Sequence, residues 1–174
     1  FSGLQRFEAA VDDCNRWCDA RFPDWNRPEW QRWTESRDIP SVVRIGHSTI
    51  RLAQMKGGLP TDERLRVRRA EFAFPALLPF PRRSMLALDS ADGRCAAQFE
   101  LMQSILLRML TALPPGKLRM TIIDPVGLGE NFAAFMHLAD YDEKLVASRI
   151  WTDKSHIEQR LADLTAHMEN VLQV

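Results

Sequence analysis

The sequence lacks any run of about 18 apolar residues, the length a helix needs to cross a bilayer, and it shows no signal peptide. We therefore expect no membrane segment and a cytoplasmic location. An excess of charge is also missing, because 23 basic side chains balance 23 acidic ones. A neutral chain has no general field that attracts nucleic acid, so any such contact would have to be local.

Cysteine is scarce: Cys14, Cys18 and Cys95 are the three in the chain. An odd number without framework spacing argues against a fold built on disulfides. Cys14 and Cys18 lie four residues apart and share one face of a predicted helix, but no Cys or His at ligand spacing completes a metal site. We interpret both as small buried side chains.

The composition is that of an ordinary globular protein, with 45% hydrophobic and 26% charged residues among 174. Residues 1–40 form a predicted helical region, because apolar residues recur at helical spacing over 4–22 and Pro23 then ends the pattern. A short helix follows over 24–33, with Asn26 as its cap. Its tryptophans are interpreted as anchors to a core, with a stacking platform for a ligand or nucleic acid as the alternative.

Residues 41–74 form a second region of short strands and a basic loop. Apolar residues on both sides of Gly46-His47-Ser48 predict two short strands around a turn. Basic and apolar residues alternate over 62–69, which indicates a solvated strand or loop, or alternatively an edge that faces DNA.

Residues 75–174 have the pattern of an α/β domain. A strand over 84–88, a helix over 95–113 and a strand over 117–123 predict a βαβ unit with parallel strands. The expected fold class is therefore α/β, with a P-loop NTPase-like βαβ core preceded by N-terminal helices and a short β-hairpin. A short helix over 131–138 follows.

A long final helix is predicted from Ser155 onward, where Ser155 and Glu158 have the spacing of a capping box. Its apolar residues recur at a spacing that fits either core packing or a coiled-coil seam. They are Ile157, Leu161, Leu164, Met168, Val171 and Leu172.

Ligands of a parallel sheet bind beyond the carboxyl ends of its strands, which here are residues 89–94 and 124–130. A phosphate loop needs glycines, a lysine for the phosphates and a hydroxyl for Mg²⁺. The first of these loops offers Gly93, Arg94 and Cys95 instead. Arg94 could pair with a phosphate at the start of the following helix, so these three are candidate nucleotide-binding residues.

Other features of the same loop oppose nucleotide binding. Asp89 and Asp92 would lie near the anion, and each like-charge contact costs on the order of 1 kcal/mol even in well-screened surroundings. The thiol of Cys95 is a poor ligand for Mg²⁺, which prefers oxygen. The loop is therefore interpreted as one that has lost nucleotide affinity.

Asp124 follows the second predicted strand and has two interpretations. It could serve as a Walker-B carboxylate, which makes it the fourth candidate nucleotide-binding residue. A carboxylate at the end of a strand is also commonly structural, where it accepts hydrogen bonds from the N–H groups of the next turn. The sequence leaves both open.

The segment Leu118–Glu130, which contains Asp124-Pro125, resembles the strand and loop after the first helix of FtsK/SpoIIIE-type DNA translocases. The resemblance covers residues 75–174. Gly93-Arg94-Cys95 stands where that family has Gly-Lys-Ser/Thr, and Val126 stands where a lysine is common. The resemblance therefore implies a degenerate copy of the motor domain.

Several expectations about partners follow from the resemblance. The chain opens at Phe1 without Met and stops within a helical pattern at Val174, so it is expected to be a piece of a larger parent protein. The parent would hydrolyse ATP with Mg²⁺, bind DNA and form a homo-oligomer. This piece would need no cofactor and would work with the remainder of its chain.

The sequence leaves three functions open. The first is a non-catalytic module that serves assembly or coupling to an active motor. The second is a nucleotide-binding ATPase domain with an atypical phosphate loop, in which Arg94 replaces lysine and Asp124 helps to hold Mg²⁺. The third is a module that self-associates through its final helix.

Overall fold

The computed structural model describes residues 2–62, 67–82, 84–89, 95–142, 145–146 and 149–172. The chain folds into two compact units, Phe1–Leu113 and Pro114–Val174. None of the helices in the described ranges is both long and apolar enough to cross a membrane.

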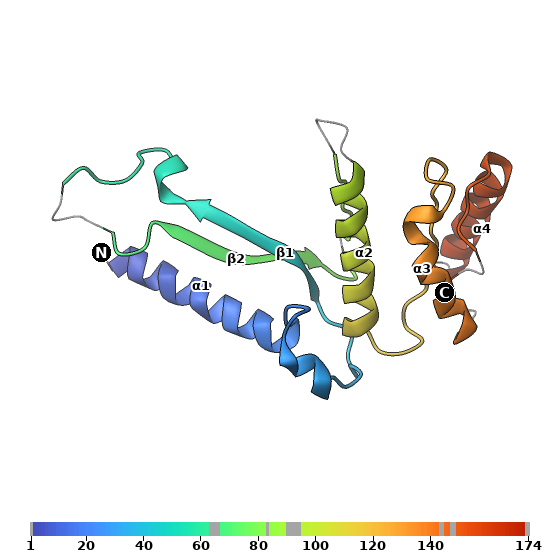
Figure 1. Ribbon diagram of the computed structural model, residues 1–174, viewed down its shortest axis with the longest axis horizontal. Helices are drawn as coiled ribbons and strands as arrows, with labels where there is room; N and C mark the ends of the chain where they lie inside the picture. Colours follow the sequence, from blue (N-terminus) through green and yellow to red (C-terminus); the bar gives the residue numbers. More distant parts are fainter. Residues whose placement is uncertain are drawn as a thin grey trace. The chain divides into compact units, whose positions relative to one another are not determined.

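The first unit is built from a helix packed on a two-stranded antiparallel sheet. Helix α1 (Ser2–Arg21) lies along strands β1 (Val42–Arg51) and β2 (Glu71–Pro79) (Figure 1). The predicted helix is confirmed, but its apolar stripe is buried only in part, because Phe7 and Trp17 are exposed. The buried apolar side chains at this junction are Val11, Cys18, Phe22, Val43 and Phe72.

Strand β1 runs through Gly46, so the predicted turn at Gly46-His47-Ser48 is wrong. Its register against β2 shifts between Arg44 and Gly46, which makes Ile45 the extra residue of a β-bulge. The sequence pattern gave no strand over Glu71–Pro79 because Pro75 and Pro79 lie within it. Proline is tolerated there because both strands of a two-stranded sheet are edge strands.

The rest of the first unit joins these elements. The tryptophan-rich segment contains the 3₁₀ helix η1 (Pro28–Arg32), and a second 3₁₀ helix, η2 (Leu52–Gln54), follows β1. Arg27 occupies the N-cap of η1 without a side-chain hydrogen bond, so the predicted cap at Asn26 is wrong. Helix α2 (Cys95–Ala112) confirms the helix predicted over 95–113.

The second unit consists of short helical turns and one long helix. The 3₁₀ helix η4 (Glu130–Phe132), helix α3 (Ala133–Met136) and the 3₁₀ helix η5 (His137–Asp140) precede helix α4 (Lys154–Leu172). Two isolated parallel bridges join Met120 to Val146 and Ile123 to Trp151. The buried apolar side chains of this unit are Met120, Ile122, Phe132, Phe135 and Val146.

The predicted P-loop NTPase-like core is wrong. Within the described ranges the named strands form one two-stranded antiparallel sheet, and residues 84–89 form no strand. The residues near 120–123 pair with the segment that follows α3, and only through isolated bridges. Met85 and Leu86 are exposed rather than buried in a sheet, so the apolar run at 84–88 was a misleading indicator.

The start of α4 is capped by a residue other than the predicted Ser155. The Asp153 carboxylate accepts hydrogen bonds from the backbone N–H groups of Ser155 and His156, at 2.9 and 3.3 Å. The Ser155 hydroxyl also donates to this carboxylate, and together these bonds lower the pKa of Asp153. A lowered pKa means that the cap is intact at neutral pH and is lost as the pH falls through that pKa.

Candidate functional site

Asp124, the predicted strand-end carboxylate, is buried within its own loop. Its side chain is 4% exposed. The Gly127 N–H donates to Asp124 Oδ1 at 2.8 Å, and Asn131 Nδ2 donates to Oδ2 at 3.2 Å. Both carboxylate oxygens therefore already have partners in the chain, which is the structural arrangement that the sequence left open.

Gly127 makes this arrangement sterically feasible. A Cβ atom at residue 127 would lie 2.7 Å from Asp124 Oδ2 and would also overlap the amide of Asn131. Only a residue without a side chain leaves room for the carboxylate to approach the backbone so closely. Gly129 completes the turn with a φ of 86° before η4 begins.

The other candidate nucleotide-binding residues are Gly93, Arg94 and Cys95. Gly93 and Arg94 lie outside the described residues, as does Asp92. Cys95 is the first residue of α2. The chemistry predicted for this loop therefore stays a prediction.

A second polar cluster, which the sequence did not indicate, surrounds Arg44 in the first unit. The Arg44 side chain is 3% exposed. Its Nη1 donates to Asp19 Oδ1 at 2.9 Å and to the Phe22 carbonyl at 3.0 Å. Its Nη2 contacts the Asp24 carboxylate and the ring of His47. These partners come from α1, from the segment after it and from β1, so Arg44 ties three parts of the unit together.

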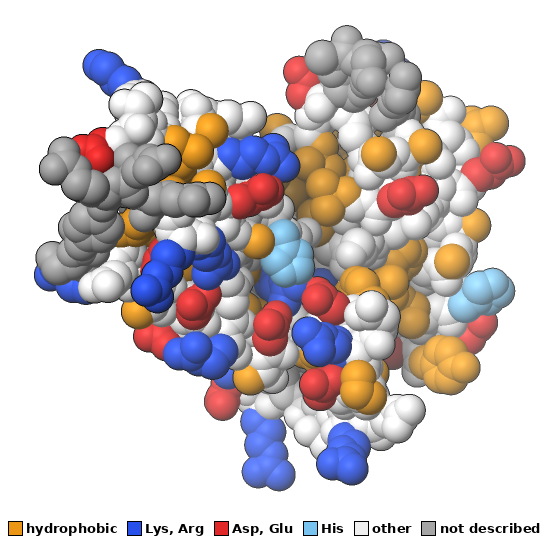
Figure 2. Space-filling view, turned by 60° about the vertical axis from the view of Figure 1, so that its left-hand side comes forward, with side chains coloured by type: hydrophobic (Ala, Val, Ile, Leu, Met, Phe, Trp, Pro, Cys, Tyr) orange, Lys and Arg blue, Asp and Glu red, His pale blue; other side chains and the backbone are white. Residues whose placement is uncertain are grey.

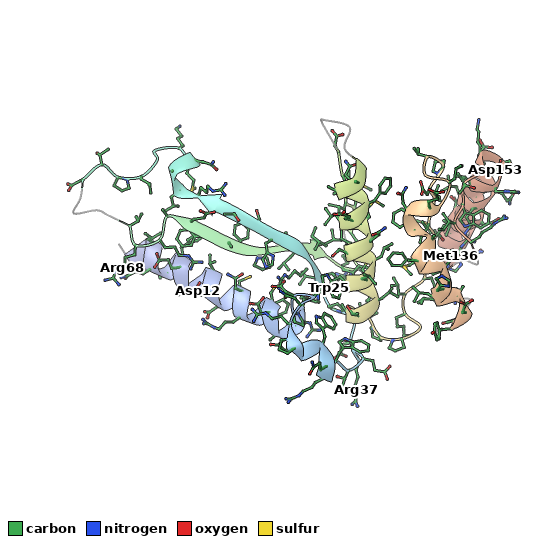
Figure 3. The ribbon with its side chains drawn as sticks, in the orientation of Figure 1. Asp12, Trp25, Arg37, Arg68, Met136 and Asp153 are labelled. Atoms are coloured by element: carbon green, nitrogen blue, oxygen red, sulfur yellow. The ribbon has the colours of Figure 1, made fainter. Side chains whose placement is uncertain are left out.

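Arg108 of α2 lies beside this cluster and packs on two tryptophan rings. Its guanidinium carbon is 4.1 Å from the Trp25 ring centroid and 5.6 Å from that of Trp30, and its Nη1 donates to the Pro23 carbonyl at 2.9 Å. Trp25 and Trp30 stack at 4.9 Å, and Trp25 lies where the end of α1 approaches α2 (Figure 3). The tryptophans therefore anchor the segment after α1 to α2, as the sequence predicted.

Burial, followed by the nearby charge of Arg44, lowers the pKa of Arg108 to about 10. The guanidinium therefore remains charged at neutral pH. A cavity of about 150 Å³ lies between the two arginines and is bounded by Asp24, His47 and Ser104. Because Asp19 and Asp24 offset the arginine charges, the cluster is best explained as a set of ion pairs and hydrogen bonds that stabilises the first unit.

Neither cluster has the geometry of a metal centre, since the described residues contain no group of three or more His, Cys, Asp or Glu side chains that could hold an ion. Basic and acidic side chains are intermingled over the face shown in Figure 2, as the zero net charge leads one to expect. Comparison with protein-family models, with curated proteins and with solved structures finds no match to this chain.

The Arg44 cluster could not be predicted from the sequence, for a physical reason. Arg44 lies between Val43 and Ile45 in a strand, where alternation would place it on the solvent side of a buried valine. The bulge at Ile45 disturbs that alternation, and both Val43 and Arg44 are buried. Only the fold reveals that the carboxylates of Asp19 and Asp24 face the Arg44 guanidinium.

Proposed function

We propose that this chain is a non-catalytic module of an FtsK/SpoIIIE-like DNA translocase, located in the cytoplasm. It serves assembly, or coupling between the remainder of its parent chain and an active motor. ATP, Mg²⁺ and DNA are then handled by the parent protein, which works as a homo-oligomer. The proposal includes no P-loop core, because the described residues form none.

One observation carries the non-catalytic part of the proposal. A Walker-B carboxylate must be free to hold Mg²⁺ or its water ligands. The Asp124 oxygens instead accept hydrogen bonds from Gly127 and Asn131, and the side chain is 4% exposed. Freeing this carboxylate for a metal would leave the Gly127 N–H and the Asn131 amide without their partner in the loop.

The link to the translocase family rests on the sequence around Asp124-Pro125. The tight turn at Asp124-Pro125-Val126-Gly127 gives these residues a structural role that does not require nucleotide. A non-catalytic module of such a protein, in which this loop has a structural role only, is compatible with this arrangement.

The decisive experiment measures Mg²⁺–ATP binding by calorimetry and ATP hydrolysis for the chain and for the variant Arg94→Ala. We expect no hydrolysis, and we expect any heat of ATP binding to be unchanged by the substitution. Arg16→Ala serves as the matched control, since Arg16 is exposed on α1 and forms an ion pair with the exposed Asp13. Binding or hydrolysis that disappears in Arg94→Ala would refute the proposal and favour the ATPase with an atypical phosphate loop.

A second candidate function, self-association with another copy, is favoured by the exposure of α4. Ile157, Leu161, Leu164, Met168 and Val171 follow one another at spacings of four and three residues, the repeat of a coiled-coil seam. The exposed fractions of Leu161, Met168 and Val171 are 48%, 61% and 62%. A second α4 has the same repeat and would cover these side chains, so the two functions are compatible.

Sedimentation equilibrium over a range of concentrations tests the self-association. We expect a mass that rises with concentration for the wild-type chain and a dissociation constant at least about tenfold higher for Met168→Glu, because a carboxylate in the seam would be desolvated. Ala166→Glu places the same charge on the opposite side of α4 and should leave the mass unchanged. A monomeric wild-type mass at every concentration would rule out this function.

A further inference from the structure

A pocket of about 320 Å³ in the second unit lies between the extended segment before Asp124 and the middle of α4. Arg119 and Thr121 line it from the extended segment. From α4 it is lined by Arg160, Asp163, Leu164 and His167. All six residues belong to one compact unit, so the pocket does not depend on the position of the other unit.

The guanidinium of Arg160 is held in place but its hydrogen bonds are incomplete. Its Nη2 donates to Thr121 Oγ1 at 3.3 Å, which is a long bond. Its Nε is buried and has no hydrogen-bond partner among the described residues. The long bond to Thr121 is the one hydrogen bond of the Nη groups among the described residues, so these groups are suited to gain an acceptor from a ligand in the pocket.

Arg119 supplies a second cation at the same pocket. Within the described ranges no hydrogen bond or ion pair engages its side chain, whereas Lys154 of the same unit does form an ion pair, with Glu158. Two guanidinium groups at one pocket repel each other unless an anion lies between them. Guanidinium groups also match the oxygens of phosphate with paired N–H donors.

The ring of Trp151 lies near the guanidinium of Arg160, one of the residues that line the pocket. The Arg160 guanidinium carbon is 5.9 Å from the Trp151 ring centroid, and that of Arg149 is 4.2 Å from the same ring. A cation beside an aromatic ring keeps its charge while its freedom is reduced. Arg149 does not line the pocket, which makes it a matched comparison for Arg160.

The charge and size of the pocket decide the class of ligand. Two arginines outweigh the single carboxylate of Asp163, whose Oδ1 already accepts a hydrogen bond from Gln159 at 3.0 Å. The volume of about 320 Å³ exceeds that of a bare ion and leaves room for a small organic group beside Leu164. The Thr121 hydroxyl adds a neutral donor for a further oxygen.

We infer that this pocket binds a phosphate monoester through Arg119 and Arg160. The phosphate oxygens accept hydrogen bonds from the Nη groups of both guanidinium groups. Asp163 limits the affinity by repulsion, and Leu164 contacts the organic part of the ligand. The residues that line this pocket include neither Arg94 nor Asp124, so the inference stands independently of the proposed function.

The test titrates the whole chain with inorganic phosphate and with phenyl phosphate at low ionic strength, followed by calorimetry and by ³¹P nuclear magnetic resonance. We expect binding of both, with Arg119→Gln and Arg160→Gln each weakening it about tenfold or more, because a charge-assisted hydrogen bond is lost. Arg149→Gln should leave the affinity unchanged. Asp163→Asn should tighten binding about threefold, since it removes a repulsive charge.

Several outcomes would overturn the inference. One is the absence of phosphate binding by the wild-type chain at millimolar concentration, and another is acetate binding as tightly as phosphate. Affinity that is unchanged in Arg119→Gln would also count against it, and because Arg119 is exposed, this variant should fold even if Arg160→Gln does not. Failure here leaves the Arg94→Ala comparison intact, because no residue is shared between the two tests.

Discussion

Replacing Arg44 with alanine is expected to lower the free energy of unfolding by about 3 kcal/mol. The substitution removes a side chain that is 3% exposed and contacts Asp19, Asp24 and the Phe22 carbonyl. It leaves two carboxylates without their cation, one buried carbonyl without a donor, and a void where the arginine stem packed. Denaturant unfolding followed by tryptophan fluorescence measures the change, since Trp17, Trp25, Trp30 and Trp33 all lie in this unit.

Arg16→Ala is the matched control for Arg44→Ala. Arg16 also pairs with an aspartate, but its side chain is 72% exposed, and exposed ion pairs contribute little. We expect a change within about 0.5 kcal/mol. Equal changes in the free energy of unfolding for the two substitutions would mean that the Arg44 contacts do not stabilise the first unit.

Replacing Asp124 with alanine is expected to destabilise the second unit by about 3 kcal/mol, because the part-buried N–H of Gly127 and the amide of Asn131 both lose this acceptor. Gly127→Ala should disrupt the same loop from the other side, since its Cβ would overlap Asp124 and Asn131. Hydrogen–deuterium exchange of residues 120–132 reports on this loop directly. Both variants should exchange much faster there than the wild-type chain.

Asp140→Ala provides the comparison for Asp124→Ala. The Asp140 side chain is 75% exposed and forms only a long ion pair with His137. We expect exchange of residues 120–132 to be unaffected by this change. Slow exchange that persists in Asp124→Ala would show that the carboxylate does not hold the loop, and the metal-binding interpretation of Asp124 would regain support.

The helices could be predicted from the sequence because their evidence is local. The periodicity over 4–22, over 95–113 and from residue 155 onward depends on neighbours within two turns, and α1, α2 and α4 follow it closely. The cap of α4 was misplaced by two residues, because Asp153 and Ser155 are both good capping residues and only the backbone decides between them.

The sheet could not be predicted, because its evidence is not local. Strand β2 contains two prolines, which argue against a strand until it is known that both strands are at an edge. The apolar run at 84–88 predicted a strand, but these residues form none in the structure. The role of Asp124 stayed open for a similar reason, since a metal ligand and a loop acceptor have the same sequence and differ only in what faces the oxygens.

Phosphate binding at the pocket of the second unit depends on side chains that no motif connects. Arg119 and Arg160 are 41 positions apart in the sequence and meet only because α4 packs beside the extended segment. No feature of the sequence distinguishes either residue from the other arginines of a chain with zero net charge. The lack of a hydrogen-bond partner for Arg160 Nε among the described residues becomes known only from the contacts of its side chain.

The outer edge of β2 is partly blocked against the addition of further strands. The Ala70 carbonyl accepts a hydrogen bond from the Leu52 N–H, and the Phe80 N–H donates to the Ser41 carbonyl. Leu52 and Ser41 flank β1, so the backbone groups of the odd-numbered β2 residues point away from the sheet. On that side the Ala73 carbonyl accepts a hydrogen bond from Asn15 of α1, and the Glu71 carbonyl accepts one from Arg69.

Pro75 and Pro79 share this orientation and have no N–H to offer. An extended peptide, or a second copy of the hairpin, would therefore find fewer donors and free acceptors on this edge than a regular strand offers. Growth of this sheet into a larger one along β2, whether by a partner or by aggregation, is therefore disfavoured.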